Sequence, residues 1–359
     1  MKGAWDMAVS QLRNSKFPKR AKALALAIPL TIAALALSAC TPAATPDPAS
    51  TSGGGGDSAK GVNIVVIGGA SDDSFFSSVK RGVDDAAKAV EANGGKVTYL
   101  SLANYNNLGP DVAQLIKNAA GQNPSAVVVP NWVPEAEDPA IKEVVASGVP
   151  VIIYNAGDID VAKNVGALTY VGTDEFLAGV AAGEALGEAG VTKNLCVNTV
   201  PGAQNLEDRC RGVAEGLSKS GGSSEQLALP GSSYGNQTAV SQAIKAAIQQ
   251  DSAVDGIVTV GGDDTPAAVD ALNQAGVAGK LTYVTFNLNT RILDAVKSGV
   301  ATAAIDQQPY AQGFYAVSSA FQYVAYGIEL PTKPILTGPL VVNKDNVEKA
   351  ISGAEEGVR

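Results

Sequence analysis

The sequence predicts an α/β protein built from two doubly wound lobes, and three observations support this prediction. From residue 61 onward, short apolar runs alternate with longer segments of helical periodicity. That alternation is typical of βαβ units and parallel sheets. It continues for about 300 residues, which exceeds one comfortable sheet. The composition, 46% hydrophobic and 17% charged, supplies enough apolar side chains for a large core.

The first half of the alternation begins with a buried strand at 62–67. A helix follows at 74–92, and the pair Gly94-Gly95 marks its end because glycine favours the position after a helix C-terminus. The pattern then repeats, and Pro150 stands at the start of the last strand of this half. Further strands are predicted at 96–100, 126–129 and 149–154, and further helices at 111–120 and 138–146.

The second half repeats the same pattern with more units. Most of its apolar runs are again followed by a helix of ten or more residues, as in βαβ units. Strands are predicted at 169–171, 194–200, 226–229, 256–260, 281–286, 301–305 and 340–343. Helices are predicted at 175–188, 205–218, 238–250, 266–275 and 312–326.

Composition excludes several functional classes. The chain has no histidine, so it has neither a histidine-based catalytic triad nor a histidine-ligated zinc site. Its 26 basic against 35 acidic residues give a net charge of −9, which argues against nucleic acid as a partner. The stretch 231–235 fits the G-x-S-x-G pattern of hydrolases, but its serine has no histidine base. We expect no enzymatic activity, no cofactor and no metal.

The N-terminus predicts export. A basic region precedes an apolar run at 23–36, which is too short for a comfortable membrane span. The run closes with Leu-Ser-Ala and Cys40, which resembles a bacterial lipobox. We therefore predict a lipoprotein signal peptide at 1–39, with lipidated Cys40 opening a flexible linker at 40–60. An ordinary signal peptide is the alternative, and translation starting at Met7 stays open.

Two cysteines remain after Cys40. Cys196 lies in a predicted strand and Cys210 lies on the helix that follows it. An even pair in an exported protein indicates a disulfide, and a strand and its crossover helix can bring two Cα atoms within bridging distance. Two buried free thiols are the alternative.

Polar and aromatic residues gather where the predicted strands end. Ligands of doubly wound sheets bind beyond the carboxyl ends of the strands. The loops there are rich in carboxylates, amides and aromatic rings. Planar polar groups match neighbouring hydroxyls, and aromatic faces cover the C–H faces of a sugar ring. These loops therefore predict a polyol site.

Six segments together resemble one known family. They read DDSFF, VPVIIYNAG, YVGTDEFLAG, NLEDRCRG, TFNLN and AAIDQQPYAQG. In this order they are similar to the simple-sugar (ribose/galactose) branch of type I ABC-transporter solute-binding proteins, over nearly all of 61–345. The resemblance implies two Rossmann-like lobes joined by three hinge strands. It places the N-terminal lobe at 61–172 plus 308–336 and the C-terminal lobe at 173–307 plus 337–359.

By position, the resemblance also implies the ligand contacts. Trp132, after the third predicted strand, is a candidate for a further aromatic wall, and Asp263 lies near a position that is usually an amide in the family. Two departures, Asn155-Ala156 in place of an acid–arginine pair and Asn287 in place of an acid, argue against the standard ribose mode. The predicted ligand-binding residues are Asp73, Phe75, Phe76, Trp132, Asn155, Arg209, Tyr234, Asp263, Phe286, Asn287 and Gln307.

For several of these residues, a purely structural role is the alternative to ligand binding. Phe75 and Phe76 could pack in the core at a helix start. Arg209 could be a surface charge, and the two asparagines could simply form turns. Trp132 could pack at the rim.

The predicted function is capture of a monosaccharide or cyclitol and its delivery to an ABC permease. The protein would be a monomer outside the cytoplasm, held to the outer face of the cytoplasmic membrane through its lipid anchor alone. A sugar sensor for a membrane receptor, a binder of another small polar metabolite, and an exported α/β enzyme are the alternatives. The enzyme would need an acid pair, for which Asp72-Asp73 and Asp263-Asp264 are the candidates.

Overall fold

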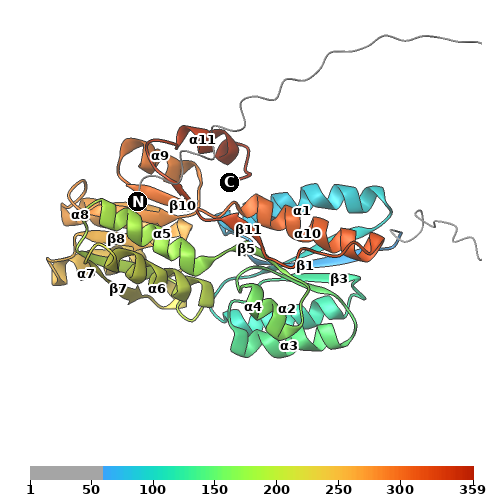
Figure 1. The fold of residues 1–359 in the computed structure, drawn as a ribbon. Helices are drawn as coiled ribbons and strands as arrows, with labels where there is room; N and C mark the ends of the chain where they lie inside the picture. Colours follow the sequence, from blue (N-terminus) through green and yellow to red (C-terminus); the bar gives the residue numbers. More distant parts are fainter. Residues whose placement is uncertain (1–59) are drawn as a thin grey trace, which may run out of the picture. The chain divides into compact units, whose positions relative to one another are not determined.

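Two six-stranded sheets organise residues 60–359, which are the residues that the computed structural model describes (Figure 1). The predicted signal peptide, Cys40 and nearly all of the linker lie outside this range. The first sheet has the order β11-β5-β4-β3-β1-β2 and the second has the order β12-β10-β9-β8-β6-β7. The two orders match strand for strand. The predicted α/β fold with two doubly wound lobes is therefore confirmed.

The strands of the first sheet are all parallel. In the second sheet, β12 runs antiparallel to β10 at one edge, and the other strands are parallel. The first sheet contains β1 (Asn63–Ala70), β2 (Lys96–Leu102), β3 (Ala126–Val129), β4 (Val151–Asn155), β5 (Tyr170–Thr173) and β11 (Ile335–Gly338). The second contains β6 (Lys193–Asn198), β7 (Ser223–Ala228), β8 (Gly256–Thr259), β9 (Thr282–Phe286), β10 (Ala303–Asp306) and β12 (Leu340–Val342).

Helices cover both faces of each sheet. On the first sheet, α1 and α10 lie on one face and α2, α3 and α4 on the other (Figure 1). We call this sheet with its helices the first lobe; the second sheet with α5 to α9 and α11 is the second lobe. The helices are α1 (Ser74–Ala92), α2 (Leu108–Ala120), α3 (Pro134–Ala146), α4 (Ile159–Val165), α5 (Glu175–Glu188), α6 (Gln204–Ser218), α7 (Gln237–Gln250), α8 (Thr265–Ala275), α9 (Thr290–Ser298), α10 (Pro309–Tyr326) and α11 (Glu348–Glu355), with short 3₁₀ turns η2 (Gly231–Ser233) and η3 (Gly262–Asp264).

The four central strands of the second lobe, β6, β8, β9 and β10, are buried on both faces. In β6, Leu195 and Val197 pack in the core beneath α7 and α8, whereas Cys196 packs in the core beneath α5 and α6. Successive side chains of a strand point to opposite faces, so one apolar run serves two cores. This explains why the strands appear in the sequence as continuous apolar runs.

The chain passes between the lobes three times. It does so from β5 to α5, from β10 to α10, and from β11 to β12. These passages are the three-strand hinge that the resemblance implied. In residues 60–359, no helix is long and apolar enough to cross a membrane.

Four short elements were missing from the sequence-based prediction: α4, α9, β11 and α11. Capping signals for two of them were present. Asp158 caps α4 and Asn289 caps α9 through side-chain acceptors, and Gly166 and Gly299 end these helices in the left-handed conformation. Each helix is only two or three turns long, which is too short for its periodicity to stand out.

Glycines set the close approach of α5 and α6. A Cβ at Gly179 would overlap the carbonyl oxygen of Arg209, and a Cβ at Gly212 would overlap the carbonyl oxygen of Phe176. Because these obstacles are backbone atoms, a side chain could be accepted only by moving one helix. The same packing holds α1 against α10, where Gly82 faces the Tyr310 carbonyl.

We predict that Gly212→Ala destabilises the protein by about 1–3 kcal/mol, because the added methyl forces α5 and α6 apart. Thermal and denaturant unfolding would measure the loss. Gly121→Ala is the matched control, since Gly121 ends α2 in a right-handed conformation with only ordinary contacts around it. Equal stability of the two variants would contradict the proposed role of the glycine contact.

Candidate ligand-binding site

A cavity lies between the two lobes, at the carboxyl ends of β1 and β3 in one sheet and of β6 and β8 in the other. These are the points where each strand order reverses, as expected for a doubly wound sheet. The cavity contains about 550 Å³ of space outside the atoms, including its opening to solvent. Its walls include Asp73, Phe75, Phe76, Trp132, Asn155, Arg209, Tyr234, Asp263, Asn287 and Gln307 from the predicted set.

The remaining predicted residue, Phe286, does not line the cavity. Its side chain is fully buried in the second lobe. The guanidinium of Arg209 lies over its ring, 4.8 Å from the ring centre. Phe286 therefore supports a cavity residue from below, in a cation–π contact.

One wall of the cavity is a chain of aromatic rings. Phe76 contacts Phe75 and Trp132 edge-to-face, with ring centres 5.2 and 5.6 Å apart. The ring centre of Tyr105 lies 6.4 Å from that of Trp132 and 4.7 Å from that of Tyr234, which belongs to the second lobe. Edge-to-face rings offer their faces in different directions, so the wall can cover an apolar ring face from more than one side.

The start of α1 explains the position of the two phenylalanines. Asp73 caps the helix, and its Oδ1 accepts a hydrogen bond from the Phe75 amide at 2.8 Å. Both rings are buried, each 7% exposed, and both belong to the first lobe's core as well as to the cavity wall. The two phenylalanines therefore pack in the core and also form part of the cavity wall.

Arg209 is a buried charge centre and not a surface residue. Its guanidinium forms a two-pronged ion pair with Glu175 at the start of α5, with N–O distances of 2.8 and 3.0 Å. It also donates to the Val260 carbonyl at 2.7 Å and to Gln307 Oε1 at 2.6 Å. Four of its five N–H groups are thereby occupied. One N–H of Nη1 is left for a ligand.

Asn155 and Asn287 occupy equivalent places in the two lobes. Asn155 is the last residue of β4 and Asn287 directly follows β9, and these two strands occupy the same place in the two matching orders. Both residues have positive φ angles, 61° and 68°. Asparagine tolerates this left-handed conformation better than most residues. Asn155 Nδ2 donates to Gln312 Oε1, and Asn287 Oδ1 accepts a hydrogen bond from Gln307 Nε2. The two asparagines therefore adopt a turn conformation and also line the cavity.

Carboxylates from both lobes meet at one end of the cavity. Asp73 Oδ2 accepts from the Tyr105 hydroxyl at 2.7 Å, and Asp263 Oδ2 accepts from the Tyr234 hydroxyl at 3.2 Å. Ser74 crosses between the lobes and donates its hydroxyl to Asp263 Oδ1 at 2.6 Å. Burial, reinforced by the nearby Asp263 charge, raises the pKa of Asp73 to about 6. Burial likewise raises the pKa of the adjacent Asp264 to about 7.

Comparison with known proteins identifies the family. A family model described as a periplasmic binding protein domain matches residues 64–328, which is more than half of the chain. The chain belongs to this family. The family consists of binding proteins and not of enzymes, in agreement with the predicted lack of catalysis.

Solved relatives share the fold of this periplasmic binding protein. A carbohydrate transporter from Acidothermus cellulolyticus, in complex with myo-inositol, is 32% identical, covers 83% of this chain and 100% of its own, and has a TM-score of 0.74. A solute-binding protein from Burkholderia graminis, in complex with D-arabinose, is 24% identical, covers 80% and 97%, and has a TM-score of 0.69. The xylose/arabinose-binding protein XylF of Sulfolobus acidocaldarius is 23% identical over 299 residues, or 79% of this chain and 72% of its own.

The sequence-based prediction missed three polar residues of this binding protein's site. Tyr105 lies in the loop after β2, and Asn205 lies at the start of α6, after β6. Both line the cavity, and Asn205 is 7% exposed. Glu175 resembles an ordinary acidic residue in a helix's first turn, and only the structure shows its pairing with Arg209. The strand-end rule could have found the first two.

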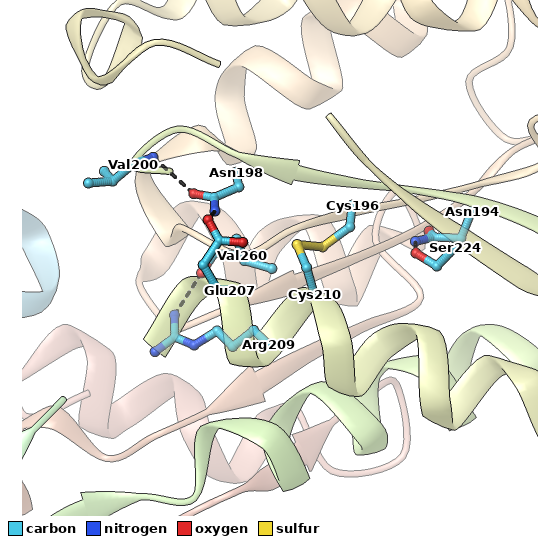
Figure 2. Close-up of a disulfide and its surroundings, with 9 residues drawn as sticks. All are labelled: Asn194, Cys196, Asn198, Val200, Glu207, Arg209, Cys210, Ser224 and Val260. Carbon is cyan, nitrogen blue, oxygen red and sulfur yellow. Dashed lines mark hydrogen bonds between the residues drawn. A yellow bond between two sulfur atoms is a disulfide. The ribbon is translucent and has the colours of Figure 1, made fainter. Parts of the chain in front are cut away.

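The disulfide between Cys196 and Cys210 is present, as the cysteine pair predicted. It joins β6 to α6 with a Cα–Cα distance of 5.7 Å. Figure 2 shows the bridge directly beside Arg209, whose side chain extends away from it toward Val260. The bridge therefore fixes α6 against its sheet one residue from the buried charge. In residues 60–359, no group of His, Cys, Asp and Glu side chains is placed to hold a metal ion.

We predict that Glu175→Gln destabilises the binding protein by about 3–5 kcal/mol, because it leaves the buried Arg209 charge without its counter-ion. Glu184→Gln on the same helix is the control. Glu184 pairs with Lys219 at 2.7 Å, but both side chains are about half exposed, so its loss should cost less than about 1 kcal/mol. Denaturant unfolding of both variants measures the difference, and equal losses would refute the distinction.

Proposed function

We propose that this protein captures a monosaccharide or a cyclitol in the cavity between its lobes and delivers it to an ABC importer. The carrying observation is the combination of an aromatic wall with unpaired polar groups deep in the same cavity. The side-chain carbonyl oxygens of Asn155 and Asn205 are buried and have no hydrogen-bond partner within residues 60–359. Unpaired buried acceptors are costly, so a ligand hydroxyl is their natural partner.

A cyclitol or hexose fits this site better than ribose bound in the standard manner. Where the family's ribose binders have an acid and an arginine, this protein has Asn155 and the fully buried Ala156. Arg209 supplies only one free N–H, because Glu175, Gln307 and Val260 take the rest. The relative with 32% identity was solved with myo-inositol, which supports a six-membered polyol ring.

Capture would work through the hinge. A ligand favours the closed arrangement only to the extent that it binds it more tightly than the open one. Cavity residues from both lobes, such as Phe76 and Asn205, supply this difference because one ring can contact both only when the lobes approach. The closed form would then present its two lobes to the permease.

The N-terminus supports a position outside the cytoplasm. The lipobox-like segment before Cys40 would leave a diacylated cysteine, and the linker at 40–60 would then connect the lipid to the lobes. Such an anchor keeps a binding protein near its permease without a membrane-spanning helix.

Calorimetric titration with neutral pentoses, hexoses and inositols tests the ligand class. We expect one-to-one binding of an unchanged ligand by one class of this panel. Phe76→Ala and Asn155→Ala should each weaken binding about tenfold or more, as loss of a ring contact or a buried hydrogen bond predicts. Tyr315→Ala is the control, because Tyr315 is an exposed aromatic residue on α10.

If no member of the panel gives a binding heat, the sugar and cyclitol assignment is wrong. Chemical conversion of the ligand would indicate an enzyme. Trp132 gives a second readout, because it lies in the cavity wall. Any ligand-induced change in fluorescence should disappear in Trp132→Phe.

Metabolic labelling with palmitate in a bacterial host tests the anchor. We expect the full chain to be labelled and to sediment with membranes, because acylation at Cys40 would hold it there. Cys40→Ser should abolish the label and release the protein from the membrane fraction. An unlabelled wild-type chain, or membrane retention of Cys40→Ser, would contradict the proposed tether.

A further inference from the structure

The charges in the cavity do not balance. Arg209 is the one basic residue among the described residues that line it, and Glu175 neutralises this charge in a buried ion pair. Asp73 and Asp263 line the same cavity, and their described side-chain hydrogen-bond donors are all neutral hydroxyl or amide groups. The lining of the cavity therefore carries an excess of negative charge.

The two acids approach each other from different lobes. Asp73 stands at the start of α1, and Asp263 lies in η3 of the second lobe. Their hydroxyl donors, Tyr105 and Tyr234, stack edge-to-face at 4.7 Å across the cleft. Bringing like charges together in a partly buried site is unfavourable unless something compensates them.

The other unpaired groups of the cavity point to the same ligand chemistry. Asn155 is 2% exposed and Asn205 is 7% exposed, and the side-chain carbonyl oxygen of each has no partner within the described residues. Both can only accept hydrogen bonds at these oxygens. Next to the acids, Tyr105, Tyr234 and Trp132 present aromatic rings, which attract cations. Acceptors, negative charge and rings all suit a donor-rich, positively charged ligand.

We propose that the preferred ligand is an amino polyol, an amino sugar or aminocyclitol, whose protonated amine lies beside Asp73 and Asp263 while its hydroxyls bond Asn155 and Asn205. This inference rests on the proposed function and narrows its ligand class. An ammonium group donates three hydrogen bonds and neutralises charge that a hydroxyl leaves unbalanced. An acidic sugar would add to the excess and is rejected.

The pH dependence follows from the groups around Asp73. It faces Asp263 and Asp264 from η3, Tyr105 from the loop after β2, Tyr234 from the loop after η2, and Tyr99 from β2. The raised pKa of Asp73, about 6, means that this carboxyl takes up a proton as the pH falls through that value. Protonation removes the charge that attracts the amine. Affinity for an amino polyol should therefore fall below pH 6, while affinity for a neutral polyol should not fall in the same way.

Matched ligand pairs test the proposal on the whole purified chain. The six hydroxyls of scyllo-inositol are equivalent by symmetry, so scyllo-inosamine can place its amine at any position of the site. D-glucose against D-glucosamine and 6-amino-6-deoxy-D-glucose form a second set, and D-glucuronate supplies the anionic member. We expect an amine-bearing member to bind about tenfold more tightly than its neutral partner at pH 7, the difference between a charged and a neutral hydrogen bond.

Variants locate the charge effect. Asp73→Asn and Asp263→Asn keep the side-chain shape, and each should bring the amine-to-neutral affinity ratio close to one. Asp270→Asn, an exposed acid on α8, should leave the ratio unchanged. If neutral polyols bind and no amine-bearing partner binds more tightly, the inference is wrong and the proposed function stands. If neither ligand set nor the neutral panel binds, both are wrong. A preference that survives both asparagine variants would overturn the assignment to Asp73 and Asp263.

Discussion

The buried guanidinium of Arg209 is the interaction on which the rest of the site depends. It joins α6, which carries it, to α5 through Glu175, to the end of β8 through Val260, and to the hinge through Gln307. A charge taken out of water is tolerated only when its partners stay in place. The glycine contacts between α5 and α6 and the disulfide from β6 to α6 hold the two helices where this requirement is met. Lysine could not replace the forked geometry of the four bonds.

The cavity is built from equivalent positions of a repeated fold. Both sheets have the same strand order, and the asparagines at the end of β4 and directly after β9 are both in the left-handed conformation. Their surroundings differ, however. Asn155 bonds Gln312 of the first lobe, whereas Asn287 bonds Gln307 in the hinge. The same backbone conformation thus has two outcomes. In one lobe the side-chain carbonyl oxygen of Asn155 has no partner among the described residues, and in the other lobe Asn287 holds the hinge residue that contacts Arg209.

The sequence predicted the fold and most of the cavity wall for a physical reason. Parallel strands bury both faces, so they show as apolar runs, and their carboxyl ends locate the loops that surround a ligand. Partnerships between distant residues leave no such pattern. The pairing of Glu175 with Arg209 and the contact of Tyr105 with Tyr234 depend on how lobes and helices approach in space. Phe286 followed the family pattern but lies beneath Arg209 because its strand turns the ring inward.

Among the described residues, hydrogen bonds and apolar packing both join the lobes across the cleft, and Val200 and Ala203 of the second lobe pack into the first lobe's core. Ser74 bonds Asp263, and the Gln204 amide donates to the Trp132 carbonyl at 2.8 Å. Exposed hydrogen bonds contribute little, and the approach of Asp73 to Asp263 opposes closure. Because a ligand shifts the lobes only through its differential affinity, the proposed amine contact with the acid pair would make closure depend on the ligand's hydrogen-bond donors and charge. In the proposed function, the same pair would couple recognition of the ligand to closure of the lobes.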